Sequence, residues 1–244
     1  KAALRDRRFD GTRRANDTAL LGFEYDDPRL NSPLELDGNL PPSVEMSIYG
    51  FMPGSRIVDA SGDQDLDDFV RNPYTFLDRP ELFLELFKKA WVSKRSPGQF
   101  ASPIPDVAKY VATAFEKLAH SKGYDFLHNA PSHYHVAMWS TSLGYSICNP
   151  DDAKTMAELA AGIKRIKASG VALTRPQESW VCVLQSLRED LIPAELNMHG
   201  PKWPQDNISQ QNLWVIKALN EKANASLKNR LLAEKNGSAG GSQS

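Results

Sequence analysis

The distribution of proline and glycine divides this chain into two parts and limits where a folded core can form. Residues 1–62 contain five prolines and six glycines. Proline removes a backbone hydrogen-bond donor, and glycine lowers the preference for regular structure. The apolar residues of this part form only short clusters, such as residues 20–23 and 48–52. We therefore predict an extended N-terminal arm over residues 1–62 that orders against another subunit; a merely flexible region is the alternative.

Beyond residue 62, apolar residues recur at the i, i+3, i+4 spacing of helices that bury one face. Capping residues, prolines and glycines mark the boundaries of these helices. The expected helices cover residues 78–91, 102–123, 131–147, 149–170, 174–193 and 213–231. Strand patterns are scarce here. The sequence predicts an all-α fold, a helical core of six to seven helices over residues 63–235. Extended N-terminal and C-terminal arms flank the core, and the latter is the Gly/Ser-rich tail of residues 236–244.

The formal net charge of −1 conceals three blocks of opposite sign. Residues 1–14 have a net charge of +4, residues 15–68 have −10, and residues 69–244 have +5. Binding of a polyanion depends on where the positive charge lies rather than on the total. The near-neutral total therefore does not exclude a nucleic-acid partner, and the acidic block is suited to docking on the positive core.

Composition excludes several classes of protein. A hydrophobic fraction of 41% is too high for a disordered chain. No apolar run approaches the roughly 20 residues of a membrane-spanning helix, so we expect no membrane partner. Two cysteines, Cys148 and Cys182, are too few for a disulfide framework or a thiolate zinc site.

Searches for catalytic and metal-binding patterns favour a protein that is not an enzyme. The chain has no Gly-rich phosphate loop, no Gly-x-Ser-x-Gly and no His-Glu-x-x-His. Cys182 lies in an apolar stretch that should raise its pKa and make it inert. On a helix, His133 and His135 would point about 200° apart. We therefore expect no catalytic residues, no cofactor and no metal, and partly exposed imidazoles at His128, His133 and His135.

Basic residues are the remaining candidates for a functional site. They form two groups at expected helix ends: Lys88, Lys89, Lys94 and Arg95, and then Lys164, Arg165, Lys167 and Arg175. Such groups can line a groove that follows phosphates. The alternative is that they are merely solvated, because Lys and Arg favour helix C-termini in any case. Trp139, Trp180 and Trp203 could stack on bases, although tryptophan at apolar helical positions is more often part of a core.

Residues 105–203 resemble the coat proteins of flexuous filamentous plant viruses, the potexvirus- and potyvirus-like group. The likeness lies in the order of features: a helix that ends at Gly123, the segment 136–146, an Ala-rich helix, and residues 173–177 before an aromatic helix and a Pro/Trp loop. The family's adjacent Arg-Gln pair is interrupted here by Pro176. The resemblance implies that single-stranded RNA lies in a groove between core and arm. It also implies that Arg175 contacts phosphate and that Ser140 lies near the groove.

Two functions follow as hypotheses. The first is a viral coat or nucleocapsid protein, present in the virion and the host cytoplasm. It would polymerise with identical subunits through its N-terminal arm and bind single-stranded RNA without sequence preference. The second is a helical protein-interaction subunit of a large cellular complex without nucleic acid, in which residues 15–68 wrap a basic partner.

Overall fold

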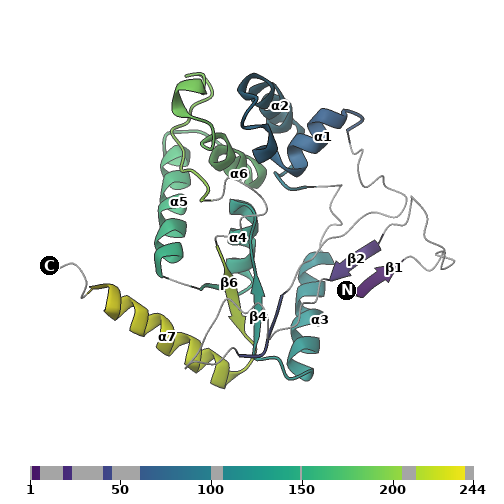
Figure 1. The fold of residues 1–244 in the computed structure, drawn as a ribbon, viewed down its shortest axis with the longest axis vertical. Helices are drawn as coiled ribbons and strands as arrows, with labels where there is room; N and C mark the ends of the chain where they lie inside the picture. Colours follow the sequence, from purple (N-terminus) through teal and green to yellow (C-terminus); the bar gives the residue numbers. More distant parts are fainter. Residues whose placement is uncertain are drawn as a thin grey trace.

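The computed structural model describes residues 2–5, 19–23, 41–45, 61–99, 107–148, 150–204 and 213–239. This part of the chain is mostly helical (Figure 1). Its seven α-helices are α1 (Gln64–Arg71), α2 (Pro80–Ser93), α3 (Val107–Ser121), α4 (Tyr134–Ser142), α5 (Pro150–Ala168), α6 (Arg175–Leu184) and α7 (Glu221–Ala239). Two short 3-10 helices, η1 (Pro73–Phe76) and η2 (Glu189–Leu191), lie between them.

Local chemistry explains why the helices begin and end where they do. The side chain of Asp63 accepts a hydrogen bond from the Leu66 backbone N–H at 3.1 Å and so caps the start of α1. The side-chain oxygen of Gln177 accepts one from the Thr174 backbone N–H at 3.0 Å at the start of α6. At the end of α5, Gly170 has a φ of +95°, a left-handed conformation that glycine adopts without strain.

The structure corrects the prediction of an all-α fold, because a four-stranded sheet runs through the molecule. It consists of β3 (Ser43–Glu45), β4 (Phe126–Asn129), β6 (Val215–Ala218) and β5 (Ser146–Ile147), in that order. β3 is parallel to β4, whereas β6 is antiparallel to both β4 and β5. Each strand has at most four residues. A strand this short shows too little alternation to be distinguished from part of a helix.

The correction changes three expected elements. The helix expected over residues 131–147 ends at Ser142 and is followed by β5. The helix expected over residues 213–231 is β6 followed by α7, which continues to Ala239. The helix expected over residues 174–193 ends at Leu184, and η2 follows it.

Part of the predicted N-terminal arm belongs to folded structure. β3 forms one edge of the main sheet. Further towards the N-terminus, β1 (Ala2–Arg5) and β2 (Ala19–Phe23) form a separate two-stranded antiparallel sheet. The rest of residues 1–62 lies outside the described residues, except for residues 41–42 and 61–62, so the extended arm remains a prediction.

The main core extends from the sheet to α1, α2 and α6, and an aromatic cluster lies between these three helices. The fully buried rings of Phe69 and Trp180 stack with centroids 5.4 Å apart, and Phe83 meets Phe69 edge to face at 5.0 Å. The indole N–H of Trp180 donates to the Arg95 carbonyl oxygen at 2.7 Å. This bond satisfies the one polar atom of the buried Trp180 side chain. The core therefore fixes α6 directly against the C-terminal end of α2.

The sheet has two buried faces. Leu127 and Val215 point into the main core, whereas Phe126 and Ile216 pack with Leu227 of α7 in a second, smaller cluster. Figure 1 shows α5 and α3 on opposite sides of β4 and β6. The two long helices therefore present separate surfaces of the molecule.

Candidate nucleic-acid interface

The turn between α5 and α6 gathers the four cations that we call the α5–α6 cluster: Lys164, Arg165, Lys167 and Arg175. All four residues are exposed. Lys164, Arg165 and Arg175 form no ion pair within the described part of the chain. These three cations are therefore available to an external anion.

Lys167 differs from its neighbours because it has a partner. Its Nζ pairs with the carboxylate of Glu178, whose side chain is only 18% exposed. The pair joins the last turn of α5 to the first turns of α6. Lys167 therefore positions the turn, and its charge is largely neutralised within the protein.

Arg175 is the first residue of α6 and lies beside the start of α4. Burial, and next the positive charge of Arg175, lower the pKa of His135 to about 4. The His135 backbone N–H donates to the Ser179 Oγ at 2.8 Å, and its Nδ1 lies 2.9 Å from the same oxygen. In the neutral tautomer that has its proton on Nε2, Nδ1 accepts the hydroxyl proton of Ser179. His135 therefore holds α4 against α6 as an uncharged ring.

The second group, which we call the α2 cluster, consists of Lys88, Lys89, Lys94 and Arg95. Lys89 pairs with Asp63 at 3.2 Å and with Glu85 at 3.1 Å. Arg95 pairs with Asp67, and the two side chains are only 12% and 4% exposed. Two of its four cations are therefore held by carboxylates, and Arg95 is nearly buried. Lys88 and Lys94 are exposed and have no ion pair among the described residues.

α6 separates the two clusters and contacts both. Its Trp180 bonds to the Arg95 carbonyl oxygen, and its Glu178 pairs with Lys167. Positions i and i+2 of a helix point about 200° apart, so these contacts lie on nearly opposite sides of α6. The structure thus brings the ends of α2 and α5 to the two flanks of one helix.

Ser140, which the resemblance places near the RNA groove, lies in the interior of the protein. It is 1% exposed, and its Oγ lies 3.5 Å from the side-chain nitrogen of Asn129 on β4. Trp180 and Trp203 are completely buried, and Trp139 is partly buried. Trp180 and Trp203 belong to the core, as expected for tryptophan at apolar positions, and their rings have no open face for a base.

His128 and His133 are more buried than the sequence predicted, whereas His135 is partly exposed, as expected. His128 and His133 are 3% and 1% exposed, so the expectation of partly exposed rings is wrong for both. The rings of His133 and His135 lie 6.0 Å apart, because His133 precedes α4 in extended backbone and does not follow helical spacing. His133 also stacks on Tyr74 at 5.7 Å. Burial, and then the neighbouring His135, lower its pKa well below the usual value.

The burial expected for Cys182 is confirmed. Cys148 and Cys182 are both buried and are not joined to each other, and burial raises the pKa of the Cys182 thiol. Among the described residues, no group of three or more His, Cys, Asp or Glu side chains could hold a metal ion. None of the described helices is both long enough and apolar enough to cross a membrane.

Sequence reasoning missed the carboxylates that neutralise the cations. Asp67 lies 28 residues from Arg95, and Glu178 lies 11 residues from Lys167. No local pattern predicts such pairs, because each depends on how helices pack. The comparisons with known proteins add no relative: no family model, no curated protein and no solved structure matches this chain.

Proposed function

We propose that this chain is a viral coat or nucleocapsid protein that binds single-stranded RNA through Lys164, Arg165 and Arg175. The observation that supports it most is that these three exposed cations lie at one helix junction without carboxylate partners in the described part of the chain. The resemblance over residues 105–203 points to the same segment. Virion and host cytoplasm are the proposed locations.

The chemistry of the cluster suits phosphates rather than bases. Lys and Arg neutralise backbone charge and release counterions, which gives sequence-tolerant and salt-sensitive binding. The guanidinium groups of Arg165 and Arg175 can also bind phosphate in a bidentate manner. On the other flank of α6, the two cations of the α2 cluster that are unpaired among the described residues, Lys88 and Lys94, would form a second positive surface.

Polymerisation along the RNA is the second part of the proposal. A contact between two different surfaces of identical subunits builds a helical filament when the rotation does not close. β3 tethers the N-terminal part of the chain at one edge of the main sheet. An arm that continues from this edge to a neighbouring copy would supply such a contact, and its net charge of −6 over residues 15–62 would favour a positive surface.

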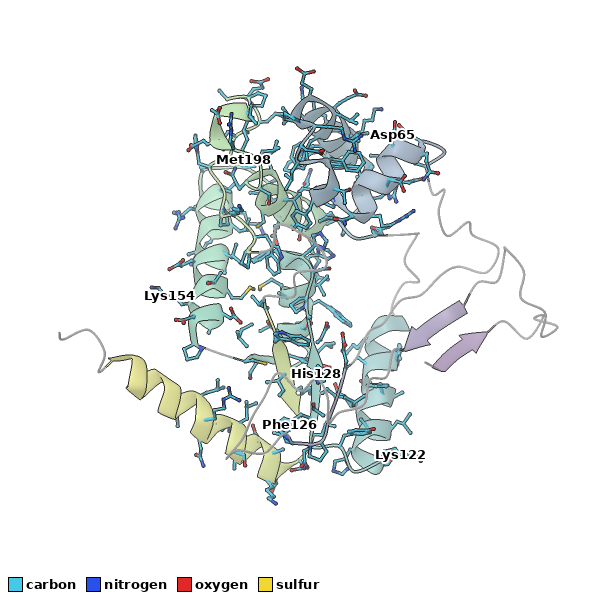
Figure 2. All side chains as sticks on the ribbon, viewed as in Figure 1. Asp65, Lys122, Phe126, His128, Lys154 and Met198 are labelled. Atoms are coloured by element: carbon cyan, nitrogen blue, oxygen red, sulfur yellow. The ribbon has the colours of Figure 1, made fainter. Side chains whose placement is uncertain are left out.

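Electron microscopy and ultraviolet absorbance of the purified protein test the proposal together. We expect filaments whose absorbance ratio at 260 to 280 nm shows nucleic acid, because subunits polymerise on RNA. Arg175→Glu should abolish the RNA-containing filaments, whereas Lys154→Glu should not. Lys154 is the matched control, since it is an exposed cation near the start of α5 (Figure 2). A protein spectrum free of nucleic acid, with a small defined oligomer, would support the protein-interaction subunit instead.

A further inference from the structure

α3 differs from the other long helices in the sign of its exposed charges. Lys109 and Lys117 on α3, and Lys122 just beyond it, are exposed and form no ion pair among the described residues. The carboxylate of Glu116 is 23% exposed and pairs with Lys217 at 2.6 Å. By contrast, α2, α5 and α7 each expose both acidic and basic side chains.

Tyr110 lies at the centre of this exposed face. It is 76% exposed, and it is the only aromatic residue among the exposed large hydrophobic residues of the described chain. Ala119, which is 3% exposed, lies nine positions further on and therefore about 180° around the helix. The buried side of α3 is thus opposite Tyr110, and the packing of the helix directs its ring to solvent.

The cations lie at useful positions around the ring. Lys117 is two turns after Tyr110, so its side chain leaves the helix within about 20° of the same direction and about 10 Å further along. Thr113, Ala114 and Ser121 share this face and are small and exposed. An exposed aromatic ring with unpaired cations before and after it along the helix, and small side chains beside it, has the features by which proteins bind single-stranded nucleic acid without sequence preference.

We propose that the exposed face of α3, formed by Lys109, Tyr110, Lys117 and Lys122, is a second contact surface for single-stranded RNA. The Tyr110 ring stacks on a base, and the lysines neutralise phosphates. The inference rests on the proposed function, and it adds a base-stacking contact that the α5–α6 cluster lacks. Lys122 and α3 lie across the sheet from α5 (Figure 2). A single RNA strand therefore meets both surfaces by passing from one copy of the protein to the next.

A protein partner fits this face less well. A stable protein interface buries about 800 Å² on each side and has an apolar centre. Among the α3 residues whose side chains the structure describes, Leu118 is the one further large apolar side chain that is exposed, at 53%. Stacking on one ring needs far less area, so nucleic acid is the occupant that the charges and the single ring favour.

Fluorescence anisotropy with a labelled single-stranded oligouridylate that spans several copies tests the inference. Tyr110→Ala should weaken binding by roughly 5- to 150-fold, the range for loss of one stacked base, and Tyr110→Phe should not. The double variant Lys109→Glu, Lys117→Glu should make the negative slope of log K against log salt shallower by about 1.4. Leu118→Ala is the matched control on the same face and should bind like the wild type. Circular dichroism checks that each variant is folded.

The outcomes separate this inference from the proposed function. If the wild type binds no RNA, both fail. If exchange of Lys164, Arg165 and Arg175 abolishes binding but the α3 variants bind normally, only the inference is overturned. If the α3 variants lose RNA binding and the variant with Lys164, Arg165 and Arg175 exchanged does not, the inference stands and the assignment of these three cations as the RNA site is wrong. Equal losses for Leu118→Ala and Tyr110→Ala, or dissociation of the assembly at unchanged RNA affinity, would assign the face to a protein partner and overturn it.

Discussion

The α2 cluster and the α5–α6 cluster are equivalent in sequence but not in structure. Each consists of four cations at a helix end. Asp63 and Asp67, at and near the start of α1, neutralise Lys89 and Arg95, whereas only Lys167 of the α5–α6 cluster has a carboxylate partner in the described chain. The fold thus holds two cations of the α2 cluster in ion pairs with α1 and leaves three cations of the α5–α6 cluster open. The value of a basic cluster for binding is decided by which carboxylates the packing brings to it.

The largest effect should come from breaking the buried pair of the α2 cluster. Arg95→Ala leaves the buried Asp67 carboxylate without its cation, which should lower the free energy of unfolding by about 3–5 kcal/mol. Urea unfolding measures this change. Arg188→Ala is the matched control, because Arg188 pairs with Asp190 on the surface, where the two side chains are 74% and 66% exposed. If the two variants lose equal stability, Arg95 has no structural role of the kind described.

Reversal of the open charges should have the next largest effect. Exchange of Lys164, Arg165 and Arg175 for Glu should weaken RNA binding on the order of 100-fold at about 0.1 M salt, since each lost phosphate contact on a single strand removes a slope of about 0.7. Filter binding measures the affinity. The control exchanges Lys154, near the start of α5, and Lys222 and Lys228 of α7, three exposed cations away from the α5–α6 junction. Equal losses in the two triple variants would mean that only the total charge matters.

Acid should weaken the junction between α4 and α6. The folded pKa of His135, about 4, lies below its unfolded value near 6.5, so its contribution to stability is complete above pH 6.5 and is lost as the pH falls toward 4. Between pH 7 and pH 5 the free energy of unfolding should fall by about 2 kcal/mol from this group. His133 adds to the fall, since its pKa is lowered too.

Urea midpoints at the two pH values measure the effect of acid. His135→Asn keeps an acceptor near Ser179 but cannot titrate, so this variant should lose less stability than the wild type on going to pH 5. A wild-type protein that is equally stable at both pH values would show that the buried rings are not held neutral.

The smallest expected effect is the difference in RNA affinity between loss of a paired cation and loss of an unpaired one in the same helix. Lys167→Gln should leave RNA affinity within about twofold, because Glu178 already neutralises this charge. Lys164→Gln should weaken binding about fivefold, as expected for one lost phosphate contact. Titrations at one salt concentration distinguish the two. The reverse order would show that Glu178 turns away from Lys167 when RNA binds.

Elements with local boundaries could be predicted from the sequence, and elements that depend on distant pairing could not. The start of α2 at Pro80 and the end of α5 before Gly170 follow from single residues with strong local preferences. The sequence predicts a helix where β6 forms, because Leu213, Ile216 and Leu219 recur every three residues. Its strand conformation arises from pairing with β4, nearly 90 residues away.

The same limit applies to the candidate site. The sequence identified every cation of both clusters, because charge is a property of single residues. Which cations are open depends on Asp67 and Glu178, and the burial of Ser140 depends on the packing of α4 against the sheet. The closeness of His133 and His135 could not be predicted either, since it requires that His133 lie just outside the helix.

The central claim is that Lys164, Arg165 and Arg175 bind RNA phosphates, and the salt dependence of binding tests it most directly. The measurement is the slope of log K against log salt for a single-stranded oligouridylate, for the wild type and for the variant with all three residues replaced by alanine. Three lost phosphate contacts should make the slope shallower by about 2. An unchanged slope, whatever happens to the affinity, would contradict the claim, because no phosphate contact would then have been removed.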